Sequence, residues 1–153
     1  MRKEAEETGI SGKLSPTDLL ESLLRTIKAK DSELRAFLRV MEDEARAQAA
    51  QAERELRAGY DRGPLHGIPV SVKDMIAYAG VPLTNGSGRF PAYVPEAHAT
   101  VVGKLLEAGA VIVGKANLYE FAYGRPHPSL GWTRNPLRPD RLPGGSSSGS
   151  AAG

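Results

Sequence analysis

The chain has 153 residues, of which 41% are hydrophobic and 25% are charged, so it can bury one ordinary core and is not compositionally disordered. It contains no cysteine, which excludes a disulfide framework, cysteine-ligated metal sites and a cysteine nucleophile. The formal net charge of +2 is too small to indicate a nucleic-acid partner.

Residues 1–60 are predicted to be a helical lead-in. Ser15 followed by Pro16 is typical of a helix start, because Ser accepts a hydrogen bond from a first-turn amide and Pro fits the first helical position. After an extended stretch at 36–40, residues 42–58 are rich in good helix formers and predict a second helix. The first helix should end near Asp31, and its apolar residues recur at helical spacing: Leu20, Leu23, Leu24 and Ile27.

Residues 61–153 are predicted to hold the core of the fold. From residue 68 to residue 73, apolar residues alternate with polar or small ones, which is the period of a strand. A helical pattern around 102–106 stops at Gly109 and leads directly into the apolar run 110–114, which has the length of a buried strand. A helix followed at once by such a strand indicates an α/β layer.

The last third of the chain is rich in turn-forming residues. Residues 121–149 contain five prolines and are predicted to be a long ordered loop, a kind of segment that is often functional. The run 144–153 (GGSSSGSAAG) could position a nucleophile or an anion, or could be a flexible linker. It matches neither a Walker A motif nor a dinucleotide-binding motif. Because the run leads into helix-forming residues with nothing after them, we expect the front part of a longer natural protein.

Lys73 has two interpretations. Most lysines are solvated, so the simpler one is an edge-strand lysine whose amine lies in water. If the side chain is buried, loss of hydration disfavours the ammonium form, and the neutral amine becomes able to accept a proton. Asp74 follows on the opposite face of the strand, so we do not expect it to neutralise Lys73.

The remaining candidate residues indicate neither a metal site nor a histidine-based triad. His66, His98 and His127 match no metal-ligand spacing, so they are predicted to be surface or loop residues. No G-x-S-x-G elbow is present, so a Ser-His-Asp triad is not supported. Tyr119 and Phe121 are interpreted as core or pocket wall.

Four segments, taken together, resemble the amidase signature family of serine hydrolases. They are residues 65–74 (LHGIPVSVKD), 109–122 (GAVIVGKANLYEFA), 134–136 (RNP) and 143–150 (PGGSSSGS), and the resemblance extends over about residues 15–153. It implies an α/β fold class with a mixed β-sheet core flanked by helices, incomplete in this chain. Residues 1–153 would then be the N-terminal portion of a single amidase-signature domain.

The resemblance also implies a Ser–cis-Ser–Lys triad. Lys73 matches the catalytic lysine of the family, and Ser146 matches the bridging serine, whose preceding peptide bond is cis. Ser147 matches a serine that supports the network. The nucleophilic serine of the family lies further along than Gly153, so this chain alone is expected to be inactive. Such a triad hydrolyses an amide bond through an acyl-enzyme and requires neither a metal nor an organic cofactor.

By analogy with the family, Tyr123 and Gly124 would bind substrate at the acyl pocket. The A subunit of glutamyl-tRNA amidotransferase usually carries a segment like MGSS after EFA, whereas residues 123–126 here read YGRP. A general amidase or an allophanate-hydrolase-like enzyme therefore fits at least as well. The alternatives are the A subunit of glutamyl/aspartyl-tRNA amidotransferase, or a non-catalytic binding subunit on the same scaffold.

The expected partner is a small-molecule amide substrate, with no direct binding of nucleic acid and with a homodimer left open. No apolar run approaches the roughly 20 residues of a membrane span. The first residues also lack the apolar core of a signal peptide. We therefore predict a soluble, cytoplasmic protein that does not associate with a membrane.

Overall fold

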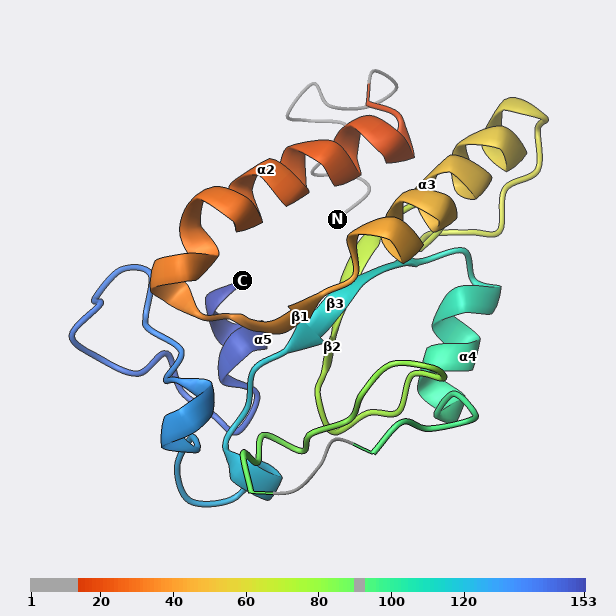
Figure 1. Ribbon diagram of the computed structural model, residues 1–153. Coiled ribbons are helices and arrows are strands. Elements are labelled where there is room, and N and C mark those ends of the chain that lie inside the picture. Colours follow the sequence, from red (N-terminus) through yellow and green to blue (C-terminus); the bar gives the residue numbers. More distant parts are fainter. Residues whose placement is uncertain (1–13, 90–92) are drawn as a thin grey trace.

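The computed structural model describes residues 14–89 and 93–153, in which a three-stranded mixed sheet lies between helices (Figure 1). Helices α2 and α3 lie along one side of the sheet and α4 lies on the other. None of the helices in the described ranges is long and apolar enough to cross a membrane. The elements in chain order are α2 (Pro16–Leu34), β1 (Phe37–Val40), α3 (Glu42–Arg57), β2 (Pro69–Lys73), α4 (Thr100–Glu107), β3 (Val111–Ala116), the 3₁₀ turns η1 (Glu120–Ala122) and η2 (Pro128–Leu130), and α5 (Ser148–Ala152).

Strand β3 is the centre of the sheet, in the order β1-β3-β2. It pairs antiparallel with β1 and parallel with β2, and all six of its residues are buried. The apolar run at 110–114 predicted this strand, but the strand continues for two residues more, through Lys115 to Ala116. A charged residue fits inside it because the Lys115 amine lies 3.1 Å from the buried carboxylate of Asp74. The prediction ended the strand too early because it took the charged Lys115 as the first residue after it.

Helix α2 begins as predicted and ends later than predicted. The Ser15 hydroxyl accepts a hydrogen bond from the Asp18 amide, and the Asp18 side chain accepts one from the Ser15 amide, so the two form a capping box. The helix runs to Leu34 and stops at Arg35, whose φ of 53° is left-handed. Asp31, the expected end, lies instead in the last turn, and its carboxylate accepts a hydrogen bond of 2.7 Å from the Ala36 amide. This contact fixes the path into β1.

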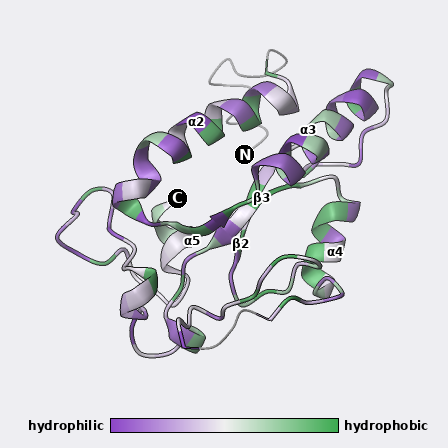
Figure 2. Cartoon of the chain, in the orientation of Figure 1, coloured by the Kyte–Doolittle hydropathy of each residue, from purple (hydrophilic) through white to green (hydrophobic). Residues whose placement is uncertain are grey.

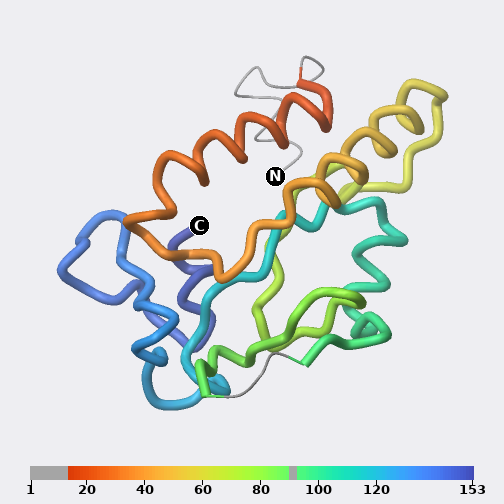
Figure 3. Tube along the Cα trace, in the orientation of Figure 1, coloured from red at the N-terminus to blue at the C-terminus, as the bar shows by residue number. Residues whose placement is uncertain are grey.

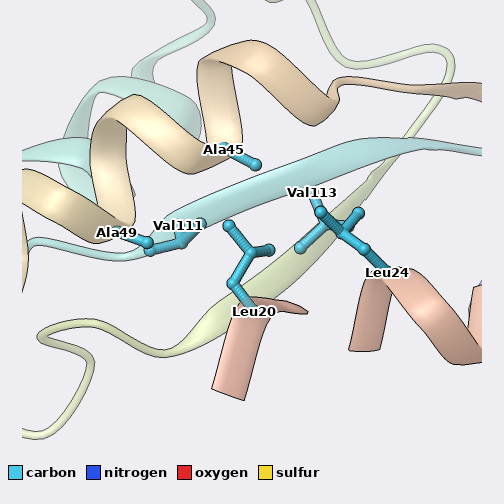
Figure 4. Packing of buried hydrophobic residues seen from close by; sticks show 6 residues of the cluster. All are labelled: Leu20, Leu24, Ala45, Ala49, Val111 and Val113. Carbon is cyan, nitrogen blue, oxygen red and sulfur yellow. The ribbon is translucent and has the colours of Figure 1, made fainter. Parts of the chain in front are cut away.

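One core cluster joins α2 and α3 to the start of β3 (Figure 4). Leu20 is completely buried and lies against small alanines of α3, which let the two helices approach closely. The apolar face of α3 is thin: the buried residues of the helix are alanines, and α3 is mainly hydrophilic while β3 is mainly hydrophobic (Figure 2). The cluster consists of Leu20, Leu24, Ala45, Ala49, Val111 and Val113.

Replacing Leu20 with Ala is expected to lower the free energy of unfolding by about 2–5 kcal/mol, because the cavity left in this cluster cannot collapse between two helices and a strand. Urea denaturation followed by circular dichroism measures the change. Leu137→Ala is the matched control, since Leu137 is 87% exposed and should change stability by less than about 0.5 kcal/mol. Equal effects of the two substitutions would contradict the placement of α2.

A second cluster fills the other side of the sheet, and Gln48 of α3 connects it to β3. The Gln48 side chain accepts a hydrogen bond of 2.7 Å from the Ile112 amide and donates one of 3.1 Å to the Tyr78 hydroxyl. It satisfies a strand amide near the point where the register between β2 and β3 shifts. Burial raises the pKa of Tyr78. The cluster consists of Met41, Val72, Tyr78, Val81, Val102 and Ile112.

The glycine- and serine-rich run is not a flexible linker. Its residues 148–152 form helix α5, in which Ser148 and Gly149 are buried. The Cα trace shows α5 close to the segment that leads from α2 into β1, far away in sequence (Figure 3). Gly149 donates a backbone hydrogen bond of 2.8 Å to Asn117, just beyond β3. The expectation that this run leads into a helix is therefore confirmed, and the first two residues of that helix are buried.

His66 is a loop residue, as was predicted for the histidines, but it is not at the surface. It lies in a turn but is only 7% exposed, with its Nε2 atom 3.1 Å from a carboxylate oxygen of Glu55. Its Nδ1 atom accepts a hydrogen bond from the Arg62 amide. The side chain is buried because Gly109, at the end of α4, packs directly against the imidazole ring. Spacing along the chain gave no sign of this contact.

Glu55 should make stability depend on pH below neutrality. Hydrogen bonds from Arg62, and then from Gln51, lower the pKa of Glu55 from 4.5 to about 2. Because the pKa of the folded state lies below that of the unfolded state, the stabilisation is complete above about pH 4.5 and is lost as the pH falls toward 2. Glu55→Gln should therefore be less stable than the wild type at about pH 5, and the difference should shrink by about pH 2.5. Urea midpoints of both proteins measure this difference, and a gap that is constant over the range would contradict it.

Candidate functional site

Two side chains from distant parts of the chain meet at the end of β2. Lys73, the last residue of the strand, donates a hydrogen bond of 2.6 Å from its Nζ atom to the Oγ atom of Ser146. The peptide bond between Gly145 and Ser146 is cis, as the resemblance implied. Lys73 is half-buried as a residue, so it is not the fully solvated lysine of the simpler interpretation. The pair brings a primary amine and a hydroxyl into direct contact.

Strand alternation places Lys73. Val72 points into the second core cluster and is buried, so Lys73 faces the opposite side of the sheet. Asp74 lies on the side of Val72 and pairs with Lys115 at 3.1 Å. The carboxylate nearest to Lys73 in sequence is thus occupied by a different lysine, as the alternation predicted.

Tyr119 and Gly145 place Ser146. The Tyr119 amide donates a hydrogen bond of 3.0 Å to the Ser146 carbonyl oxygen. The Tyr119 ring lies so close to Gly145 that a Cβ atom there would be 2.4 Å from it. Gly145 is therefore required for close approach, and Tyr119 belongs to the wall of the site rather than to the general core.

Ser148 contributes more to this loop than Ser147 does. Ser147 precedes α5, and among the described residues its hydroxyl makes no hydrogen bond. Ser148 is completely buried, and its Oγ atom lies 3.0 Å from the Thr133 hydroxyl, which donates to the Arg35 carbonyl. The sequence did not single out Ser148 or Thr133, because one serine among several in a small-residue run carries no distinguishing signal.

Asn117 is another residue that the sequence did not single out. It is buried just after β3, and its side-chain amide donates to the carbonyls of Arg35 and Gly131 at 3.0 and 3.3 Å. Its backbone carbonyl accepts the hydrogen bond from Gly149. Asn117 therefore joins the end of α2, the loop at 131 and helix α5, which together hold the Ser146 loop on the sheet.

Tyr123 and Gly124 lie on an exposed turn after η1. Tyr123 is 86% exposed, and no hydrogen bond joins either residue to Lys73 or Ser146 within the described ranges. The turn is unusual because the preceding Phe121 and Ala122 have φ values of 48° and 59°, which non-glycine residues rarely adopt. The role of Tyr123 and Gly124 in substrate binding stays a prediction.

The arrangement is suited to proton transfer between oxygen and nitrogen. A neutral amine can accept the Ser146 proton across 2.6 Å, and the Ser146 oxygen can in turn take a proton from a third group. Among residues 14–89 and 93–153, no group of three or more His, Cys, Asp or Glu residues is placed to hold a metal ion. The contact between Lys73 and Ser146 is what points to acid–base chemistry at these two residues.

Comparison with known sequences supports this assignment of the motifs. The family model described as Amidase matches residues 18–153. The A subunit of the glutamyl-tRNA(Gln) amidotransferase from Anaeromyxobacter dehalogenans (strain 2CP-C) is 46% identical over 147 residues, which cover 94% of this chain and 30% of that protein. The corresponding protein from Chloroflexus aurantiacus (strain ATCC 29366 / DSM 635 / J-10-fl) is 43% identical, over 93% of this chain and 30% of the relative.

Solved structures agree with the sequence matches. The native peptide amidase from Stenotrophomonas maltophilia has a TM-score of 0.82 and 38% identity, over 96% of this chain and 32% of that one. The A subunit of the glutamyl-tRNA(Gln) amidotransferase from Thermotoga maritima has a TM-score of 0.68 and 37% identity, over 90% of this chain and 28% of that one. The chain thus spans about 30% of the length of the relatives that it matches.

Proposed function

Because the chain belongs to the amidase signature family, we propose that the protein carrying it hydrolyses the carbon–nitrogen bond of an amide through a Ser–cis-Ser–Lys triad. The observation that carries this proposal is the 2.6 Å contact between Lys73 Nζ and Ser146 Oγ. In this triad Lys73 is the general base, Ser146 is the bridge that relays the proton, and the third member, a second serine, is the nucleophile.

The proposed reaction has two stages. In the first, the nucleophilic serine attacks the amide carbonyl while its proton passes to Ser146, and the Ser146 proton passes to the neutral amine of Lys73. Return of a proton along the same path to the nitrogen breaks the C–N bond, releases the amine and leaves an ester on the nucleophile. In the second stage water attacks that ester and gives up a proton to the relay. The relay then returns a proton to the oxygen of the nucleophilic serine, the bond between that oxygen and the acyl carbon breaks, and the acid is released.

The nucleophile and the oxyanion hole would come from a part of the protein outside these 153 residues. The resemblance to the family implies this placement, and it is consistent with a chain that covers only about 30% of the length of its relatives. The described residues supply the base and the bridge, the two members of the triad that accept the proton of the nucleophile. On this account the 153 residues alone have no amidase activity.

The substrate class we propose is a small-molecule amide. Tyr123 and Gly124 would line the acyl side of the pocket, and Ser147 would support the hydroxyl network once the nucleophile is present. The chemistry needs no cofactor, since the proton acceptor and the nucleophile are both side chains. We propose that the protein is cytoplasmic, which cell fractionation would test. Whether it forms a homodimer would be measured by light scattering.

A second candidate is the A subunit of a tRNA-dependent amidotransferase. The observation that favours it is the set of relatives with that name, which reach 46% identity. The same acyl-enzyme chemistry would then release ammonia from a side-chain amide for transfer to another acyl group. The YGRP sequence at residues 123–126 differs from the segment usual in those proteins, so the general amidase remains our first choice.

A substrate panel separates the two candidates. The full-length protein is incubated alone with a peptide amide, an aryl amide and glutamine, and ammonia or amine release is measured. A general amidase hydrolyses at least one of the first two without a partner protein. Activity that requires both glutamine and companion proteins of an amidotransferase complex would favour the second candidate. No hydrolysis under either condition would contradict the proposal and support a non-catalytic role on the same scaffold.

A further inference from the structure

A second lysine lies behind the site, buried in the sheet. Lys115 of β3 is 0% exposed, and its Nζ atom lies 3.1 Å from the Asp74 carboxylate and donates a hydrogen bond of 2.7 Å to the Ile76 carbonyl. The register pairs Lys115 with Val72, so this amine is on the opposite side of the sheet from Lys73. The proposed reaction does not use it.

Asp74, the partner of Lys115, has all of its polar atoms engaged. Its amide donates to the Ala116 carbonyl at 3.0 Å, and its own carbonyl accepts from the Asn85 amide at 3.2 Å. The second carboxylate oxygen accepts hydrogen bonds from the Thr84 amide at 3.0 Å and from the Thr84 hydroxyl at 2.5 Å. The residue directly after Lys73 is therefore held from two sides, by β3 and by the turn at 84–85, with only 1% of it exposed.

Stability alone is a weak reason for such a pair. Removing two charges from water costs several kcal/mol for each ion, and well-packed apolar residues in the same space are often at least as stable. Lys115 also interrupts an otherwise apolar, completely buried strand. A buried pair of this kind is better explained by the geometry that it imposes on its neighbours.

The contacts of Asp74 also extend to the second member of the site. Asn85, which is bonded to Asp74, accepts a backbone hydrogen bond of 2.8 Å from Phe121. Two residues earlier, the Tyr119 amide donates to the Ser146 carbonyl at 3.0 Å. The loop that Asp74 anchors thus contacts the turn that holds Ser146. One buried ion pair is connected to both ends of the contact between Lys73 and Ser146.

We propose that the buried Lys115–Asp74 ion pair positions Lys73 against Ser146, and that Lys115 and Asp74 are positioning residues of the reaction. The inference rests on the proposed function, because it assigns a task to residues next to the proposed base. Lys115 holds Asp74, and Asp74 fixes the end of β2 so that the Lys73 amine meets the Ser146 hydroxyl. A displacement of about 1 Å in such a contact can slow a reaction by about 10²-fold.

The test uses the full-length protein and a fluorophosphonate probe that reacts with an activated serine, so no natural substrate is needed. Lys115→Met leaves the Asp74 carboxylate without its cation, whereas Asp74→Asn combined with Lys115→Met removes both charges. The maximal inactivation rate constant, the probe concentration for half-maximal rate, and the melting temperature are measured for each variant. Leu20→Ala is the matched control, because it destabilises a core cluster that lies on the opposite side of the sheet from Lys115 and Asp74.

Positioning predicts that Lys115→Met lowers the maximal rate constant by about 10²-fold and leaves the half-maximal probe concentration within about twofold. The double variant should regain melting temperature but not rate, since no buried charge is left unpaired and the end of β2 is still not held. Leu20→Ala should lose melting temperature and keep its rate. If Lys115→Met does not fold, the double variant alone decides the question.

Two results would overturn the inference. The first is a Lys115→Met variant that folds and has the rate constant of the wild type. If Lys115→Met does not fold, the corresponding result is a double variant with the rate constant of the wild type. The other is a double variant that recovers rate and melting temperature together, which is the behaviour of a purely structural pair. Lys73→Met is measured in parallel: if it reacts like the wild type, the proposed function itself fails. If Lys73→Met is unreactive while the ion-pair variants are normal, only this inference fails.

Discussion

Replacement of Lys73 with Met is expected to lower the kcat for amide hydrolysis by the full-length protein by about 10²–10⁴-fold, the range for losing a positioned general base. Met has nearly the length of Lys and keeps the contacts of its aliphatic chain, so the loss reports on the amine. The Ser146 hydroxyl would then have no acceptor for its proton within the 2.6 Å contact. The measurement is steady-state hydrolysis of whichever amide in the panel reacts fastest.

Lys104→Met is the control for this experiment. Lys104 lies on α4 with an exposed side chain, so its loss removes one positive charge without touching the site. Its kcat should stay within about twofold of the wild type. If Lys73→Met also stays in that range, Lys73 is a surface lysine of an edge strand and the proposed triad is wrong.

Gly149→Ala is expected to have the second large effect, on both stability and activity. A Cβ atom at this position would lie 2.1 Å from the Ala36 carbonyl oxygen and 2.5 Å from the Asn117 amide nitrogen. Both contacts are with backbone, which cannot rotate away as a side chain can. Helix α5 must therefore move off the sheet, and the Ser146 loop moves with it. Overpacking of this kind typically costs about 1–3 kcal/mol, and occasionally more.

Gly103→Ala is the matched control, because Gly103 lies within α4 and a Cβ atom there meets nothing within 4 Å. This substitution should be neutral or stabilising by up to about 1 kcal/mol, since Ala is the better helix former. Urea denaturation and amide hydrolysis are measured for both variants. If Gly149→Ala keeps wild-type stability and kcat, α5 does not pack where the structure places it.

Local patterns predicted the elements that are stabilised by local interactions. Ser15 and Pro16 predicted the start of α2, and the helical spacing of Leu20 and Leu24 predicted its buried face, although the end of the helix was placed too early. Alternation placed Lys73 and Asp74 on opposite sides of β2, and the structure confirms that placement. The meeting of Lys73 with Ser146 came from the family motifs, because no periodicity relates residues 73 positions apart.

Residues whose environment is created by tertiary contacts escaped the sequence analysis. The charge of Lys115 indicated that the apolar strand had ended, because the sequence does not show that Asp74 lies beside it in the folded chain. The burial of His66 was not predicted either, because it depends on Gly109, a residue distant in sequence that packs against the imidazole ring. Ser148 is indistinguishable in sequence from its serine neighbours, and only burial beside Thr133 separates it from Ser147. In each case the signal lies between segments distant along the chain.

The central claim is that Lys73 and Ser146 act as one proton-accepting unit, and a double-mutant cycle on the full-length protein tests it most directly. The maximal rate constant for fluorophosphonate labelling is measured for the wild type, Lys73→Met, Ser146→Ala and the double variant. Residues that act as a unit are non-additive, so the account predicts that the double variant reacts about as slowly as either single variant. Losses that multiply in the double variant, or a Ser146→Ala variant that labels like the wild type, would contradict the account.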